Sequence, residues 1–306
     1  GDYDVDGCTA VALVYKFLRQ LGHQNLTFYI PDRYTEGYGI SVKGIDLAAR
    51  KGVGLIIALD CGIKATEKVV YAKEKGVDFI ICDHHLPAEE IPRAVAVLDP
   101  KRVCSSPFDE LSGCGVGFKL VQAYAQKNGI PFERILGLLD LLVVSIASDI
   151  VPLVNENRIL AHFGLKYLNR EPSKGLLSII KICGLDKHNI TIDDIVFKIG
   201  PRINAAGRMR MDETDENASP SGGHAAVELL IEGNESVAEE FGNVIDAYNQ
   251  DRKSIDRSVT QEAHNYIESN PELKRRKSTV IYNPKWMKGI VGIVASRLIE
   301  TYYRPT

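Results

Sequence analysis

Short apolar runs alternate with amphipathic stretches over the first hundred residues, and this alternation restricts the chain to a small set of folds. The apolar runs predict strands at residues 26–30, 54–59, 79–82 and 94–98. Helical spacing between them predicts helices at residues 9–21, 41–51 and 64–75. Strand–helix units of this kind join through right-handed crossovers, so we expect an α/β fold with a mainly parallel sheet. The first helix has no strand before it, which leads us to expect a further strand upstream of Gly1.

The rest of the chain predicts mostly helix. Residues 115–183 are too apolar for a surface helix and should pack around the sheet. The acidic stretch 211–223 predicts a loop, and helical spacing from there to about residue 269 predicts a long connector helix. After Asn270-Pro271, a strand at 279–282 and a helix at 289–301 would begin a second, smaller α/β domain. We therefore divide the chain into 1–210, 211–270 and 271–306, with the last unit truncated.

Charge and cysteine content narrow the class of protein. The 37 Lys and Arg residues against 40 Asp and Glu give a formal charge of -3, so binding to nucleic acid would need a local basic surface. The six cysteines have no CxxC spacing, which favours reduced thiols in the cytoplasm over a disulfide framework. The most apolar stretch, 138–151, contains two aspartates and is too short to span a membrane.

Three aspartates alternate at the start of the chain. In an extended backbone Asp2, Asp4 and Asp6 would project the same way and would repel one another without a cation. Taken alone, the cluster could equally be an Asp-rich turn that caps the following helix. The alternation therefore suggests a divalent metal but does not establish one.

Further ligand-type side chains follow the predicted strands. Asp60 follows the strand at 54–59, and Asp83-His84-His85 follows the strand at 79–82. The carboxyl ends of parallel strands meet at one edge of the sheet, where open α/β folds bind ligands. Asp149 interrupts an apolar segment, where a carboxylate needs a partner or a metal. We expect these groups to gather at one rim.

Mixed carboxylate and imidazole ligands suit Mn²⁺ or a similar ion such as Mg²⁺, and four or more carboxylates can hold two ions. Paired ions about 3.5–4 Å apart are a usual device for hydrolysing phosphate esters. The residues alone therefore predict metal-assisted phosphoester hydrolysis.

The same segments resemble a known family. Residues 2–7 (DYDVDG), Asp60-Cys-Gly, Asp83-His-His and Ser148-Asp149 are similar to the four motifs of the DHH phosphoesterases. Residues 31–39, 201–209 and 289–298 are similar to motifs of the RecJ branch of that family, whose members are single-strand-specific DNA exonucleases. The resemblance covers nearly the whole chain, with the motifs in the expected order. It implies a DHH domain at 1–210 and the start of the DHH-associated C-terminal domain at 271–306.

The resemblance also assigns roles within the site. It implies that two Mn²⁺ or Mg²⁺ ions are held by Asp4, Asp6, Asp60, His84 and Asp149, with Asp2 as an addition. His85 would lie near the scissile phosphate, either stabilising its charge or assisting proton transfer, and Asp83 would orient an imidazole. The residues implied to bind substrate are Arg33, Tyr38, Arg202, Asn204, Arg208, Ser296 and Arg297.

The implied reaction is degradation of single-stranded DNA from the 5' end to 5'-mononucleotides, in DNA repair and recombination. A single-strand-binding protein and a helicase are the implied protein partners of a cytoplasmic monomer with no membrane contact. One departure from the family is Trp286-Met287-Lys288, where a histidine usually follows the tryptophan. The stretch 221–226 only imitates the family's glycine-rich motif, so we expect His224 to have no catalytic role.

Two alternatives remain open. One is a nano-RNase or 3'-phosphoadenosine phosphatase of the same superfamily, although such enzymes generally lack the motifs at 36–39 and 202–209. The other is a catalytically silent nucleic-acid-binding scaffold, which loss of metal ligands would indicate. Every matched ligand is present here.

Overall fold

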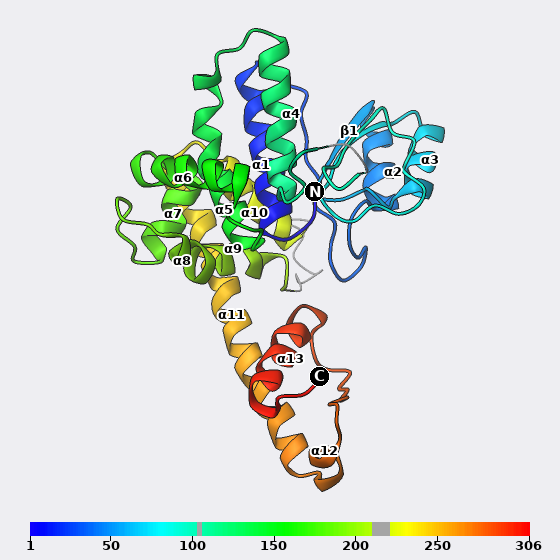
Figure 1. Ribbon diagram of the computed structural model, residues 1–306, viewed down its shortest axis with the longest axis vertical. Helices are drawn as coiled ribbons and strands as arrows, with labels where there is room; N and C mark the ends of the chain where they lie inside the picture. The colour runs from blue at the N-terminus through cyan, green and yellow to red at the C-terminus, as the bar shows by residue number, and fades with distance from the viewer. Residues whose placement is uncertain (103–105, 210–220) are drawn as a thin grey trace.

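The computed structural model describes residues 1–102, 106–209 and 221–306. A small parallel sheet lies beside a mostly helical body, and the long helix α11 (Glu235–Glu268) runs out of that body to the C-terminal segment (Figure 1). The predicted α/β class with a parallel sheet is confirmed.

The sheet has three strands in the order β1 (Leu55–Leu59), β2 (Asp78–Cys82) and β3 (Ala96–Leu98), all parallel. Leu59 pairs with Cys82, and Cys82 pairs with Leu98, so the three strands end in register. The residues that directly follow them, including Asp60 and Asp83, therefore start from one rim.

Helices cover both faces of the sheet. Successive strand residues point to opposite faces, so Ala58 packs toward α2 (Val42–Arg50) and α3 (Thr66–Glu74), whereas Leu59 packs toward α1 (Val5–Gln20) and α4 (Gly113–Lys127). Because helices cover both faces of the sheet, the strand sequences are continuous apolar runs and do not alternate between apolar and polar residues.

The helical body is built around α5 (Leu139–Ser148), in which residues 139–147 are all buried. Its other elements are η1 (Phe132–Arg134), η2 (Leu136–Leu138), α6 (Asn155–Arg170), α7 (Lys174–Ile182), α8 (Ile192–Asp194), η3 (Ile195–Ile199), α9 (Gly200–Ala206) and α10 (Gly222–Ile231). The mostly helical character predicted for 115–183 is confirmed, but its packing around the sheet holds only for α4, since α5, α6 and α7 pack mainly on other helices.

The C-terminal segment packs on the far half of α11. It contains α12 (Pro271–Arg275) and α13 (Lys288–Tyr302). Val259 and Ala263 of α11 share a separate apolar cluster with Ile290 and Leu298 of α13. Figure 1 shows α13 lying along α11, away from the sheet.

Two predicted strands are absent from the described residues. Residues 26–30 form no strand, and the Tyr29 carbonyl accepts a hydrogen bond from the Gly1 ammonium at 3.0 Å. Residues 279–282 also form no strand, and the Thr279 amide donates to the Pro305 carbonyl at 2.7 Å. A strand requires a neighbouring edge to pair with, which strand propensity alone does not supply.

The connector is two helices rather than one. α10 ends at Ile231, and α11 begins after Asn234, whose side chain accepts hydrogen bonds from the amides of Ser236 and Val237. An N-cap in mid-segment ends helical continuity despite the unbroken apolar spacing. Of the predicted loop 211–223, residues 211–220 lie outside the described residues, while Gly222 and Gly223 are helical.

None of the helices in the described part of the chain combines the length and the apolar character needed to cross a membrane.

Candidate metal centre

The aspartates at the start of the chain do not lie on one extended strand, so that expectation is wrong. α1 begins at Val5, and Asp4 is its N-cap, accepting a hydrogen bond from the Gly7 amide at 3.0 Å. Asp6 therefore lies inside the first helical turn and faces a different direction from Asp2 and Asp4. The helix-cap and metal-site interpretations each hold in part, because the Asp4 carboxylate caps α1 and the three aspartates still lie at the rim.

Asp6 is held by the start of another helix. Its carboxylate accepts hydrogen bonds from the amides of Gly113 at 2.6 Å and Cys114 at 2.8 Å, and from the Ser145 hydroxyl at 2.6 Å. These amides belong to the first turn of α4, where unpaired N–H groups and the helix dipole favour a negative charge. The sequence analysis missed Ser145, since only packing brings α5 to α1.

Asp60 follows β1 in a left-handed backbone conformation, with φ at 59°. A Cβ atom on Gly113 would lie 2.5 Å from the Asp60 Oδ1 atom, so only glycine allows α4 to start this close. Burial, followed by the nearby Asp6 and Asp4 charges, raises the pKa of Asp60 well above its usual range. The protein thus holds a carboxylate where its charge is unfavourable unless a cation is present.

His84 faces three carboxylates with one ring nitrogen. Its Nδ1 lies 2.9 Å from the Leu111 carbonyl, and a carbonyl can only accept, so Nδ1 carries the proton. Nε2 lies 3.3 Å from Asp60 Oδ1 and 3.7 Å from both Asp6 Oδ2 and Asp149 Oδ2. Burial lowers the pKa of His84, which favours the neutral ring. The Nε2 lone pair therefore points at carboxylate oxygens, an arrangement that suits a shared cation.

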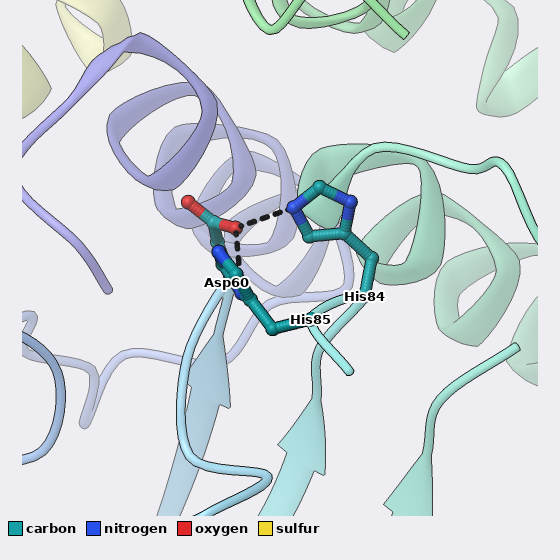
Figure 2. A group of neighbouring side chains, drawn as sticks. All are labelled: Asp60, His84 and His85. Atoms are coloured by element: carbon teal, nitrogen blue, oxygen red, sulfur yellow. Dashed lines mark ion pairs between the residues drawn. The ribbon is translucent and has the colours of Figure 1, made fainter. Parts of the chain in front are cut away.

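His85 is oriented by different partners. Its Nδ1 donates to Asp83 Oδ1 at 2.8 Å, and its Nε2 lies 3.1 Å from the Tyr38 hydroxyl. This bond to Asp83 raises the pKa of His85. Burial opposes ionisation of Asp83, but hydrogen bonds from His85 and the Ile63 amide outweigh it, so its pKa is lowered. Figure 2 shows both histidines directed at Asp60.

The carboxylates and imidazoles form three overlapping groups, in each of which the ligand atoms lie within 4.8 Å of one another. The groups are Asp2, Asp4 and Asp60; Asp6, His84 and Asp149; and Asp60, His84 and His85. Burial, with repulsion from neighbouring aspartates, raises the pKa of both Asp2 and Asp149 to about 7. Every predicted ligand therefore lies in at least one of these groups, and Asp60 belongs to two of them.

The donor set fits divalent cations. Oδ1 of Asp2 and Oδ1 of Asp60 are buried and lack a hydrogen-bond partner among the described residues. Orphaned carboxylate oxygens beside an imidazole lone pair are costly in a protein alone and are satisfied by a hard or borderline metal ion. The groups Asp2–Asp4–Asp60 and Asp6–His84–Asp149 have no residue in common, and they suit two neighbouring ions because Asp60 Oδ1 lies 3.3 Å from His84 Nε2.

Three of the predicted substrate residues lie next to this centre. The Arg33 guanidinium stacks 4.0 Å from the centroid of the Tyr3 ring, and its Nε donates to the Gly207 carbonyl at 2.8 Å. Arg208 donates to the Gly289 carbonyl at 3.2 Å, which ties α13 to the body. Tyr38 reaches the centre through His85, as described above. Asn204 is on α9, with its Oδ1 buried and unpartnered among the described residues.

The others are engaged elsewhere. Arg202 forms an ion pair with Asp246 of α11 at 2.8 Å. Arg297 pairs with the buried Asp256 at 2.6 Å, and the Ser296 hydroxyl donates within its own helix to Gly292. These contacts already give the arginines a structural role. Residues 202–206 of the motif at 201–209 lie in the helix α9.

His224 behaves as expected of a packing residue. Its ring stacks on Phe28, with centroids 4.3 Å apart, and its Nδ1 lies 3.5 Å from Glu228. Trp286 belongs to the segment that differs from the family pattern, and its indole N–H donates to the Glu262 carboxylate at 3.1 Å. Neither residue is among the groups that could hold a metal within the described residues.

The arrangement matches a known family. Residues 1–146 match the model of the DHH family, N-terminal domain. This part of the chain is therefore similar to the N-terminal domain of the DHH family. Among curated proteins, the single-stranded-DNA-specific exonuclease RecJ of Bacillus subtilis (strain 168) is 39% identical over 306 residues, covering all of this chain and 36% of that protein. RecJ of Escherichia coli (strain K12) is 34% identical over 321 residues, covering all of this chain and 53% of that protein.

Solved structures agree with this similarity. An exonuclease RecJ bound to manganese superposes with a TM-score of 0.84 at 28% identity, over 99% of this chain and 72% of that one. RecJ from Thermus thermophilus in complex with Mn²⁺ gives 0.83 at 27% identity, over 99% of this chain and 42% of that one. The chain spans between about a third and about half of the length of the curated relatives.

Proposed function

We propose that this protein is a metal-dependent exonuclease that hydrolyses single-stranded DNA from the 5' end to 5'-mononucleotides. The observation that carries the proposal is the His84 Nε2 lone pair, which is directed at the buried carboxylates of Asp6 and Asp60 and at the partly exposed carboxylate of Asp149, three groups from separate segments. The similarity of the whole chain to single-stranded-DNA-specific exonucleases RecJ supports the substrate. The direction of cleavage is what the resemblance of the motifs implies.

The proposed ligands divide into two sets. Asp2, Asp4 and Asp60 would hold one ion, and Asp6, His84 and Asp149 would hold the other, with Asp60 close to both. Mn²⁺ or Mg²⁺ bound there would supply positive charge to the phosphodiester and activate the attacking water. The Gly113 and Cys114 amides hold the Asp6 carboxylate in place, so its oxygens are presented without reorganisation.

His85 acts beside these ligands. Its Nδ1–H is fixed by Asp83, and its side chain is 44% exposed, so a substrate can reach the ring. The raised pKa favours the protonated imidazole, which would stabilise negative charge on the phosphate or donate a proton to the leaving oxygen. Tyr38 would set the angle of the ring through its hydroxyl.

Burial of the rim supports selectivity for single strands. Asp6 and Asp60 are each 2% exposed, so a phosphodiester must enter a recess to reach them. A flexible single strand can bend into such a recess, whereas a duplex is too wide and stiff. Arg33 and Arg208, near the start of α1, would contact backbone phosphates, which makes affinity depend on salt rather than on base identity.

The test compares 5'-labelled and 3'-labelled oligonucleotides, single-stranded and blunt duplex, with Mn²⁺ present. We expect early mononucleotide release from the 5' label of the single strand only. Equal cleavage of blunt duplex, or early release from the 3' label alone, would contradict the proposal. Preference for dinucleotides or phosphoadenosine would instead favour the nano-RNase or phosphatase alternative.

We further propose the division into a DHH domain at 1–210, an acidic loop and connector at 211–270, and the beginning of a C-terminal domain from 271. The separate apolar cluster between α11 and α13 supports the last boundary. A cytoplasmic location is supported by the described cysteines, all of which are free thiols. The monomeric state, the single-strand-binding protein and the helicase stay predictions.

A further inference from the structure

The rim contains a cation that none of the motifs above includes. Asp99 directly follows β3, as Asp60 follows β1 and Asp83 follows β2, and Lys101 lies two residues further along the same turn. The Asp83 amide donates to the Leu98 carbonyl at 3.0 Å, so the end of β3 is bonded directly to the start of the Asp83-His84-His85 segment.

The turn after β3 fixes the position of Lys101. Asp99 is 5% exposed, and its Oδ1 accepts a hydrogen bond from the Lys101 amide at 2.8 Å. This Asx turn fixes the backbone of Lys101 close to the end of β3. The next residue, Arg102, points back along the strand and donates to the Val97 carbonyl at 2.9 Å. Of the two adjacent cations, only Lys101 is left to face the centre.

The side chain of Lys101 is half-buried and has neither an ion pair nor a hydrogen bond from its ammonium within residues 1–102, 106–209 and 221–306. Its charge nevertheless acts on the centre. Burial is the main influence on both groups: it lowers the pKa of His84 and raises the pKa of Asp149 to about 7. The positive charge of Lys101 disfavours the protonated form of each group. A half-buried lysine whose charge acts on an acidic cluster, and whose ammonium has no partner among the described residues, can offer its three donors to another anion.

We propose that Lys101 binds a backbone phosphate of the substrate on the His84–Asp149 side of the centre. The inference rests on the proposed function, because it requires a nucleic-acid strand at this rim. Arg33 and Arg208 lie near Tyr3 and Asp4, at the start of α1, whereas Lys101 leaves from the end of β3. The strand would thus be held by cations on two sides of the reacting phosphate, which fixes its direction through the centre.

A counter-charge role is the structural alternative. In that case Lys101 would only reduce repulsion among the carboxylates, and its loss would change stability but not the number of phosphates bound. Losing one phosphate contact to a single strand should reduce the slope of log K against log salt by about 0.7. The two roles therefore predict different measurements.

The experiment measures binding of a fluorescent single-stranded oligonucleotide to the full chain by anisotropy, over a salt series with Ca²⁺ in place of Mn²⁺. We expect Lys101→Met to lower the salt slope by about 0.7 and to raise KM about tenfold, and Lys101→Arg to restore both. Lys127→Met is the matched control, since Lys127 lies in the last turn of α4, at the end away from the centre. It should behave as the wild type does.

An unchanged slope in Lys101→Met, with the wild-type protein active, would overturn the inference and leave the proposed function intact. A change of equal size in Lys127→Met would also overturn it, because the effect would then be general electrostatics. If the wild-type protein neither binds nor cleaves single strands, the proposed function fails first and the inference falls with it. Melting temperatures of all variants show whether any loss reflects unfolding.

Discussion

Acidic side chains differ in their partners between two regions of the molecule: the rim of the sheet, and the junction of the helical body with α11 and α13. At the rim, Asp60 and Asp2 each keep a buried carboxylate oxygen that has no hydrogen-bond partner among the described residues. At the junction, the half-buried Asp246 pairs with Arg202 at 2.8 Å, and the buried Asp256 pairs with Arg297 at 2.6 Å. The junction satisfies its acids with its own arginines, whereas the rim leaves them for a ligand.

The difference separates structural charges from functional ones more sharply than residue type does. Arg202 and Arg297 lie in motifs similar to those of RecJ, yet each already has a carboxylate partner. A paired charge contributes to the fold whether or not it also meets substrate, whereas an unpaired buried charge costs free energy until a ligand arrives. Each prediction below tests one side of this comparison.

The largest effect is expected from Asp60→Ala. Loss of a group that only supports a metal ligand typically costs about 10–100-fold, so loss of a proposed ligand should exceed about 100-fold in nucleotide release. The fold should survive or gain stability, because the substitution removes a buried carboxylate repelled by Asp6 and Asp4. Single-stranded DNA cleavage with excess Mn²⁺, alongside circular dichroism melting, checks both statements. Asp246→Asn is the control, and activity of Asp60→Ala within a few-fold of it would contradict the assignment.

Metal binding should stabilise the rim and leave the junction unaffected. A ligand at a hundredfold excess over its Kd adds about 2.7 kcal/mol to folding stability. We therefore expect Mn²⁺ to raise the melting temperature of the wild-type protein by several degrees, and of Asp246→Asn by the same amount. His84→Ala should lose most of this increase, since its Nε2 lies among three of the proposed ligands. An increase of equal size in His84→Ala would remove that residue from the ion site.

Asp83→Asn tests whether orientation of His85 contributes to the reaction. The amide oxygen can still accept the Nδ1–H bond but carries no charge, so the support that raises the pKa of His85 is weakened. We expect about a tenfold loss in kcat with little change in KM, and a pH profile displaced to lower pH on its alkaline side. Full activity with an unchanged profile would show that the pair is only structural.

The carboxylates at the rim could be predicted from the sequence, whereas the groups that hydrogen-bond to the rim residues could not. Asp60 and Asp83 could be placed because each ends an apolar strand, and parallel strands end together. The Ser145 hydroxyl and the Leu111 carbonyl could not, since they reach Asp6 and His84 only through the packing of α4 and α5. Residues 26–30 were misjudged for a related reason, because pairing depends on a neighbouring edge that local pattern does not reveal.

At the junction, Arg297→Ala should reduce stability because it leaves the buried Asp256 without its ion-pair partner. Arg297 is half exposed, so solvent screening limits the loss to about 1–2 kcal/mol. Urea unfolding measures it, and adding Asp256→Asn should recover part of the loss by removing the stranded charge. If the double variant is no more stable than Arg297→Ala, the pair is not the source of the effect.

The smallest effect concerns backbone strain beside the rim. Ile150 follows Asp149 with φ at 58°, and its side chain is 79% exposed. A β-branched residue in this left-handed conformation costs about 1–2 kcal/mol, while glycine costs about 0.5–1 kcal/mol in backbone entropy, and little apolar burial is lost. Ile150→Gly should therefore be neutral to slightly stabilising, by up to about 1 kcal/mol. Leu153→Gly is the matched control, because Leu153 is 42% exposed and has no left-handed backbone, so it should be destabilised. Equal destabilisation of both variants in urea would show that Ile150 is not strained, and that the rim differs from the junction in its charges alone.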